Sequence, residues 1–200
     1  NLVTIIYRIV GEGTKFMANI QKGSEVDIMG PLGRGYDVLS LTKEQTALLV
    51  GGGIGVPPLY ELAKQFNQRG IKTIAILGFN TKDEVFYEEE FKKFGETYVS
   101  TVDGSVGTKG FVTDVIKKLQ AENNLVFDKY YSCGPVPMLK ALVNTVGEDG
   151  YISLENRMAC GIGACYACVC KKKKENKNKD DYTRVCYDGP VYLASDVEIE

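Results

Sequence analysis

Short apolar runs alternate with amphipathic segments in the middle of the chain. The run Ala47–Val50 is typical of a strand that is buried on both faces of a parallel sheet. It enters a glycine-rich turn, and an apolar helical face follows before Gly70. That face comprises Leu59, Leu62, Ala63 and Phe66.

The same alternation continues along the chain and predicts the rest of this domain. Each apolar run is short enough for a strand, and each amphipathic segment is long enough for a helix. We therefore predict an α/β fold, with a doubly wound parallel sheet of at least four strands and right-handed crossovers. The further strands are predicted at Ile71–Gly78, Thr97–Val102 and Lys129–Ser132, and the further helices around Phe86–Phe94, Phe111–Leu119 and Met138–Val146.

The segments on either side of this pattern have a different character. Val3–Val10 and Ser24–Met29 resemble strands, and glycine-rich turns follow each of them. Two or three strands do not close a barrel or a sandwich, so residues 1–40 are predicted to be the tail end of a β-domain. Residues 41–150 form the predicted nucleotide-binding domain. Residues 151–200, rich in glycine, cysteine and tyrosine, form a third domain.

The polar run Lys171–Asp181 interrupts the third domain. We expect a solvated loop there, and an electrostatic docking surface is the weaker alternative because acidic residues offset part of the charge.

Composition narrows the chemistry that is open to the chain. The 200 residues include 24 basic and 26 acidic side chains, and this balance gives no support to binding of nucleic acid or of an anionic membrane. The sequence contains no histidine, which excludes Ser-His-Asp and Cys-His nucleophiles, histidine-ligated zinc enzymes and Rieske clusters. No signal peptide or membrane-spanning run is visible, so we expect a cytoplasmic protein.

Two turns after predicted strands are candidates for ligand binding. The run Gly51–Gly55 offers uncluttered backbone N–H groups before a helix, which suits phosphate oxygens, although Val56 replaces the last glycine of the common dinucleotide fingerprint. The alternative is a tight turn that needs glycine for packing. Cys133-Gly134-Pro135 follows the last predicted strand, where open α/β sheets bind ligands. The alternative for Cys133 is a small buried apolar residue.

Four cysteines near the C-terminus give the strongest signal. The spacing Cys160-x4-Cys165-x2-Cys168, with the distant Cys186, matches the plant-type [2Fe–2S] pattern. The small residues between Cys160 and Cys165 let the loop curl closely around a cluster. Structural zinc is the alternative, although it usually shows paired C-x2-C units, and free or disulfide-bonded thiols are less favoured. Cys170 is expected to be a spectator.

Joined in order, these segments resemble the electron-transfer subunits of B-type dihydroorotate dehydrogenases, within the ferredoxin–NADP⁺ reductase-like superfamily. The resemblance runs nearly end to end, and its C-terminal part is the most specific because the wider superfamily lacks it. The matching stretches are Leu49–Leu62, Asp103-Gly104-Ser105, Gly107–Asp114, Tyr131–Pro135, Cys160–Cys165 and Arg184–Val191.

The resemblance implies electron flow between NAD⁺/NADH, FAD and a [2Fe–2S] cluster, linked to an FMN-containing catalytic subunit in a hetero-oligomer that oxidises dihydroorotate in pyrimidine biosynthesis. No side chain need act as a catalytic acid or base. The implied FAD residues are Ile6, Tyr7, Arg8, Gly13 and Thr14. The implied nucleotide residues are Gly52, Gly53, Ile54, Gly55, Cys133, Gly134 and Pro135, with Cys133 beside the nicotinamide. The implied cluster ligands are Cys160, Cys165, Cys168 and Cys186.

The sequence departs from the family in two places. The resemblance implies that residues 1–40 are the C-terminal part of a flavin-binding antiparallel β-barrel that begins before Asn1. The family's Arg-Pro-x-Ser sequence is missing, so the FAD site is expected to be incomplete and a chain starting here to retain little flavin. The spacing between Cys168 and Cys186 is longer than usual and suggests a surface insertion. Two rival functions are a reductase subunit that serves another oxidoreductase and a non-redox nucleotide-binding module stabilised by zinc.

Overall fold

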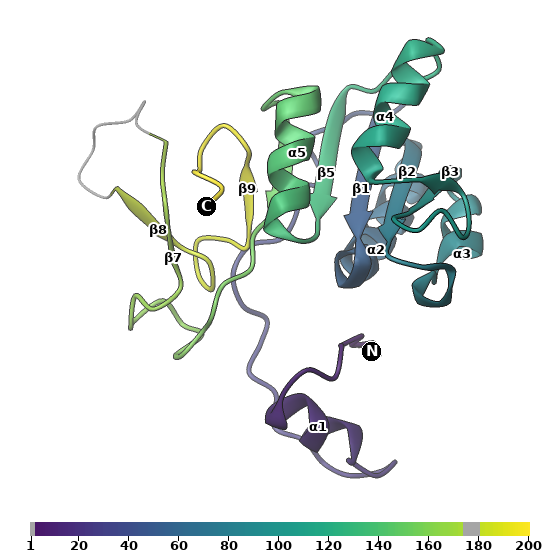
Figure 1. Ribbon diagram of the computed structural model, residues 1–200. Coiled ribbons are helices and arrows are strands. Elements are labelled where there is room, and N and C mark those ends of the chain that lie inside the picture. Colours follow the sequence, from purple (N-terminus) through teal and green to yellow (C-terminus); the bar gives the residue numbers. More distant parts are fainter. Residues whose placement is uncertain (1–2, 174–180) are drawn as a thin grey trace. The chain divides into compact units, whose positions relative to one another are not determined.

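The computed structural model describes residues 3–173 and 181–200. It divides into two compact units, Asn1–Pro31 and Leu32–Glu200. The smaller unit contains the helix α1, and the larger contains every strand in the described part of the chain (Figure 1).

The larger unit is built on a seven-stranded sheet with the order β4-β3-β2-β1-β5-β6-β9. Its strands are parallel except for β9, which pairs antiparallel with β6. The expected doubly wound sheet is therefore confirmed, and three further strands extend it. The strands are β1 (Thr46–Gly52), β2 (Lys72–Phe79), β3 (Gly95–Thr101), β4 (Thr108–Lys109), β5 (Lys129–Cys133), β6 (Gly150–Ser153) and β9 (Val191–Leu193).

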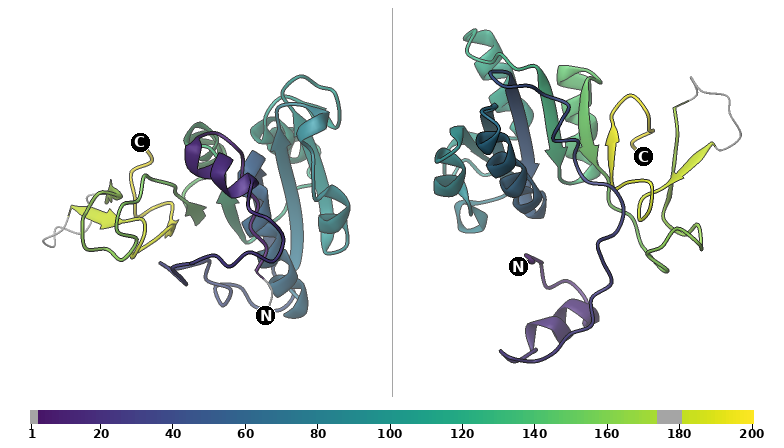
Figure 2. Two further views of the ribbon diagram at one scale, coloured as in Figure 1. Left: turned by 90° about the horizontal axis from the view of Figure 1, so that it is seen from below. Right: turned by 180° about the vertical axis from the view of Figure 1, so that it is seen from behind.

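Helices cover both faces of the sheet, which explains why β1 is apolar throughout. Leu48 and Val50 pack with α4 and α5 on one face, and Ala47 and Leu49 pack with α2 and α3 on the other. Since side chains alternate along a strand, both layers need apolar residues. The two helix layers can be followed in the front view of Figure 1 and the back view of Figure 2. The helices are α2 (Val56–Gln68), α3 (Glu88–Lys92), α4 (Val112–Ala121) and α5 (Val136–Val146), with short 3₁₀ turns at Gly53–Gly55 and Lys82–Glu84.

The cysteine-rich segment packs against the same sheet. Its strand β9 adds to β6, and β7 (Val169–Lys171) pairs with β8 (Tyr182–Arg184) in a separate antiparallel ribbon. Cys168 and Cys186 are buried in the core layer that contains α4 and α5. The segment that holds the candidate cluster ligands is thus joined to the nucleotide-binding sheet by backbone pairing and by a shared core. Part of the predicted polar loop, residues 174–180, lies outside the described residues.

The smaller unit differs from the prediction. No strand forms among residues 3–31, so the expected strands Val3–Val10 and Ser24–Met29 are not found and a barrel remnant is not confirmed. An isolated extended segment leaves its backbone groups without a ladder, and strands become stable only in a sheet. The predicted turn after Gly11 is instead the start of α1 (Glu12–Ala18), where the Thr14 hydroxyl accepts hydrogen bonds from the N–H groups of Val10 and Gly11.

Among the described residues, no helix combines the length and apolar character that crossing a membrane requires.

Candidate functional site

Two strand-to-helix turns meet at the carboxyl end of the central strands. Gly51 on β1 is the register partner of Cys133 on β5. After Gly51 the polypeptide turns through Gly53–Gly55 into α2, and after Cys133 it turns through Gly134-Pro135 into α5. The predicted glycine turn and the predicted Cys133 turn therefore lie next to each other. Adjacent strands whose helices cover opposite faces of the sheet define the switch point at which such folds bind ligands.

Gly55 makes this close approach possible. A Cβ atom at Gly55 would collide with the carbonyl group of Cys133 and would lie 2.7 Å from the Gly134 nitrogen. Glycine is therefore needed at this position because the two turns touch through their backbones. This contact supports the alternative that the turn needs glycine for packing. The packing and a binding role are compatible, since the same turn leaves Ile54 47% exposed at the surface.

The two helices give this edge its electrostatic character. α2 and α5 both begin at these turns. Each has proline in its first turn, which removes an N–H donor there but no hydrogen bond within the helix. The first N–H groups of a helix have no partner within the helix and favour negative charge nearby. Two such ends at one sheet edge suit the phosphates of a dinucleotide.

Cys133 is held as a neutral thiol at this edge. Burial raises its pKa to about 11, and a hydrogen bond with Ser153 lowers the pKa only in part. Tyr36 packs close by, with its hydroxyl donating to the Ser132 carbonyl at 2.8 Å and its own pKa raised well above the usual value by burial. The thiol is thus a poor nucleophile and a compact apolar neighbour for a ligand.

The four candidate cluster cysteines fall into two pairs. Cys160 and Cys165 form one pair and Cys168 and Cys186 the other, because in each pair the backbone N–H of the second residue donates to the Sγ of the first. Cys168 and Cys186 are buried, whereas Cys165 is exposed and Cys160 is intermediate. The four residues that the spacing singled out therefore form an outer pair and an inner pair.

Backbone N–H groups surround the outer pair. Ala164 and Cys165 donate to the Sγ of Cys160 at 3.3 and 3.4 Å. Hydrogen bonds from the backbone of Cys165 and of Ile162 are the main causes that lower the pKa of the Cys160 thiol to about 6. In the inner pair, the Cys186 N–H donates to the Sγ of Cys168 at 3.4 Å. N–H groups directed at sulfur stabilise thiolates, which are the form that binds iron.

These residues fit a two-iron cluster. Each iron of a [2Fe–2S] centre takes two protein ligands, and the cysteines are already arranged two and two. Within the described residues, no three His, Cys, Asp or Glu side chains converge where one ion could bind. Cys170 packs against the core that contains Cys168 and Cys186, and its pKa is raised mainly by burial, while a hydrogen bond with Tyr192 acts in the opposite direction.

Arg184 connects the two cysteine-bearing segments. Its Nη1 donates to the Gly163 carbonyl at 2.9 Å, and its Nε and Nη2 donate to the Asp188 carboxylate at 2.9 and 3.2 Å. Its guanidinium carbon lies 5.3 Å from the ring centre of Tyr166 and 4.6 Å from that of Tyr187. Sequence analysis did not assign this residue a function, although Arg184 begins one of the stretches that resemble the family and lies two residues before Cys186.

The candidate FAD residues lie in the smaller unit. Ile6 and Thr14 are partly buried, and Tyr7, Arg8 and Gly13 are exposed. The Thr14 hydroxyl bonds to the backbone of its own turn, where it also donates to the Gly11 carbonyl at 3.0 Å. No flavin contact can be assigned on this geometry, and the FAD residues stay a prediction.

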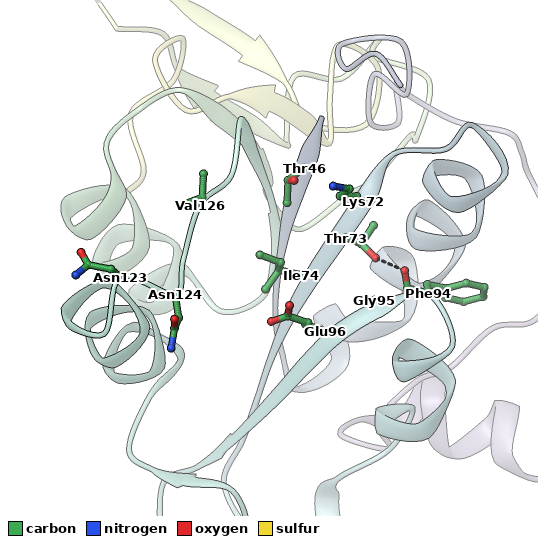
Figure 3. Close-up of a pocket in the computed structure, with 10 residues that line it drawn as sticks. All are labelled: Thr46, Lys72, Thr73, Ile74, Phe94, Gly95, Glu96, Asn123, Asn124 and Val126. Carbon is green, nitrogen blue, oxygen red and sulfur yellow. Dashed lines mark hydrogen bonds between the residues drawn. The ribbon is translucent and has the colours of Figure 1, made fainter. Parts of the chain in front are cut away.

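A shallow cavity of about 410 Å³ lies elsewhere on the larger unit (Figure 3). Thr46, Lys72 and Gly95, which line it, are the first residues of β1, β2 and β3. The cavity is therefore at the amino ends of the strands, opposite the edge where the two turns meet. Parallel α/β sheets bind ligands at the carboxyl edge, so we assign no function to this cavity.

Known families match both halves of the larger unit. Residues 49–144 match the oxidoreductase NAD-binding domain, and residues 155–198 match the iron–sulfur cluster binding domain of dihydroorotate dehydrogenase B. Fold and site together define a pyridine-nucleotide oxidoreductase that carries an iron–sulfur module.

Close relatives identify the family. The chain is 93% identical over its whole length to the electron transfer subunit of dihydroorotate dehydrogenase B (NAD⁺) from Fusobacterium nucleatum subsp. nucleatum, of which it spans 76%. It is 56% identical over its whole length to the subunit of that name from Lysinibacillus sphaericus, again spanning 76%. The chain belongs to the family of dihydroorotate dehydrogenase B electron transfer subunits, and the expected resemblance is confirmed.

A solved structure agrees with this assignment. A chain of the NADH-dependent reduced ferredoxin–NADP oxidoreductase, determined in work on flavin-based electron bifurcation, is 30% identical and superimposes with a TM-score of 0.81. The match covers 96% of this chain and 67% of the other.

Proposed function

We propose that this chain passes electrons between NAD(H), FAD and a [2Fe–2S] cluster, and between that cluster and the catalytic subunit of dihydroorotate dehydrogenase, in pyrimidine biosynthesis. The observation that carries the proposal is the arrangement of four cysteines in two pairs on a segment that shares its sheet with the glycine turn. Family membership supports the partner, an oxidoreductase catalytic subunit. We propose further that this partner contains FMN and assembles with the chain as a hetero-oligomer.

Each region of the chain has its own task in this proposal. We assign residues 41–150 to nucleotide binding, residues 151–200 to the cluster and residues 1–40 to part of the flavin site. Gly52–Gly55 and Gly134 bind the dinucleotide phosphates through backbone N–H groups, and Pro135, which has no N–H, borders the same site. Cys133 borders the nicotinamide as a neutral thiol, so it adds no charge where a hydride is exchanged.

Cys160, Cys165, Cys168 and Cys186 hold the cluster in this proposal. When bound, the cluster supplies one-electron transfer and the flavin supplies the conversion between one- and two-electron chemistry. The chain orients these groups and directs N–H donors at the sulfur atoms. No side chain is required as a general acid or base, which agrees with a sequence that contains no histidine.

The test uses the full-length subunit, purified without oxygen, alone and with its catalytic subunit. We expect iron and sulfide in equal amounts, visible absorbance that NADH bleaches, and the same bleaching by dihydroorotate only when the catalytic subunit is present. A colourless protein with one zinc per chain would overturn the redox assignment. Reduction by NADH without any response to dihydroorotate in the complex would overturn the proposed partner and favour another oxidoreductase.

A further inference from the structure

The hydrogen bond between Arg184 and the Gly163 carbonyl has a consequence for Cys160. The Gly163 carbonyl and the Ala164 N–H belong to one planar trans peptide, so they point in opposite directions. Arg184 Nη1 holds the carbonyl at 2.9 Å, and the N–H on the other side of the peptide lies 3.3 Å from the Sγ of Cys160. The guanidinium is therefore linked through one peptide plane to a candidate cluster ligand.

Gly163 allows this peptide to take the orientation that Arg184 holds. Its φ angle is +79°, a left-handed conformation that favours glycine. A Cβ atom there would lie 2.8 Å from the Cβ of Tyr187 and 3.3 Å from Arg184 Nη1. The close packing of Arg184 over the loop thus depends on the missing side chain.

Arg184 is itself held from several sides. Asp188 accepts two hydrogen bonds from the guanidinium and a third, at 3.0 Å, from the Arg184 backbone N–H. The rings of Tyr166 and Tyr187 flank the guanidinium. Tyr166 has φ +57°, which is uncommon outside glycine and indicates that surrounding contacts determine the loop. A side chain fixed this firmly can orient a peptide, which a mobile surface arginine could not.

We propose that Arg184 is a positioning residue that directs the Ala164 N–H at the Sγ of Cys160 and thereby raises the reduction potential of the cluster. The proposal rests on the assignment of Cys160 as a cluster ligand in the proposed function. Reduction adds one negative charge to the cluster, so a hydrogen bond to its sulfur stabilises the reduced form more than the oxidised form. A positive charge on the far side of the peptide polarises the N–H and strengthens this effect.

Arg184→Gln tests the proposal, because glutamine removes the fixed guanidinium and keeps a polar side chain. We expect the variant to retain iron and sulfide, and its cluster to become three- to tenfold harder to reduce, where tenfold is about 59 mV for a one-electron couple. The midpoint is measured by a redox titration monitored by electron paramagnetic resonance. Resonance Raman spectroscopy of the iron–cysteine stretches should show a weakened hydrogen bond at a cysteine sulfur.

Two further variants separate positioning from charge and from folding. Arg157→Gln removes the same charge from an exposed residue of the same segment and should leave the midpoint unchanged. Arg184→Lys keeps the charge without the planar fork, and its midpoint should lie between those of the wild type and Arg184→Gln. This variant decides the matter if Arg184→Gln loses its cluster.

The proposal on Arg184 is overturned if the midpoint reduction potential of Arg184→Gln equals that of the wild type. If Arg184→Gln holds no cluster, the same comparison is made with Arg184→Lys. An equal fall in Arg157→Gln would also overturn it, because charge alone would then account for the effect. Wild-type protein without iron would refute the proposed function itself, so the two failures are distinguishable.

Discussion

The nucleotide-binding region and the cysteine loop both bring backbone N–H groups to a candidate ligand site, but they hold these groups by different means. The turn at Gly53–Gly55 follows β1, which is buried from Ala47 to Gly52, and the core on both faces of the sheet fixes the turn. The loop from residue 155 to residue 166 is mostly exposed and contains no strand or helix. Its conformation depends on the hydrogen bond to the Cys160 sulfur, on the hydrogen bond from Arg184 to the Gly163 carbonyl, and on the positive φ angle of Gly163.

This difference indicates that the two sites should respond differently to change. A turn fixed by a hydrophobic core forms without its ligand, because burial of apolar surface has already stabilised it. A loop with little buried surface gains stability from whatever binds its thiolates. We therefore expect the cysteine loop to depend on its metal cluster and the nucleotide turn to be present before NADH arrives.

The largest effect should come from removing one cluster ligand. Cys165→Ser should abolish most of the visible absorbance, because serine is a poor substitute for a thiolate on iron, while far-ultraviolet circular dichroism still reports the folded sheet. Cys170→Ser is the matched control and should keep iron and absorbance near the wild-type level. Equal losses in the two variants would contradict the ligand assignment, and loss of the sheet in Cys165→Ser would contradict the independence of the two regions.

The second effect concerns the reactivity of Cys133. With its pKa raised from 9.0 to about 11, the folded protein at pH 8 should contain about a hundredfold less Cys133 thiolate than the unfolded chain. Because the folded pKa is the higher one, the labelling rate should keep rising as the pH increases toward 11. Mass spectrometry of the iodoacetamide-labelled peptide measures this rate, with the urea-unfolded chain as the reference. A rate that levels off below pH 9.5 would refute the burial argument.

The third effect concerns the contact between the two turns. Gly55→Ala places a methyl group against the Cys133 carbonyl and should cost about 1–3 kcal/mol in the free energy of unfolding. We expect NADH affinity to fall more than tenfold as the turn is displaced, as measured by fluorescence titration. Gly35→Ala is the control, since no atom lies within 4 Å of the added Cβ. Unchanged affinity in Gly55→Ala would separate the turn from the nucleotide site.

The smallest effect should be the choice of nucleotide. The segment Asn80-Thr81-Lys82 after β2 offers one lysine and no arginine fork for a 2′-phosphate. The Asn80 side chain donates to the Glu84 carboxylate at 2.9 Å, so this end of the strand also carries an acidic group. We expect about a tenfold preference for NADH over NADPH in kcat/KM, and a smaller preference in Glu84→Gln. A tenfold preference for NADPH would reverse the conclusion.

The sheet could be predicted because its signal is local and repeated. The predicted strand Ala47–Val50 is apolar along its whole length, and the structure extends it by one residue at its start and two at its end. The strands β4, β6 and β9 were missed because they are two to four residues long and become strands by pairing with a longer neighbour. The opposite error occurred at Val3–Val10, where β-branched residues have no partner strand. In each of these cases pairing with another strand, and not the β-propensity of the residues, decides whether a strand forms.

The sequence by itself determined the alternation of strands and helices, the glycine turn and the four cysteines with their spacing, because each is a pattern among residues near in the chain. The tertiary structure alone decided that Gly55 touches the Cys133 turn, that the cysteines form two pairs, and that Arg184 reaches the Gly163 carbonyl. Gly55 and Cys133 are 78 residues apart, Gly163 and Arg184 are 21 apart, and Cys168 and Cys186 are 18 apart, whereas Cys160 and Cys165 are only five apart. Such contacts follow from the packing of the sheet and the loop, and no pattern of neighbouring residues records them.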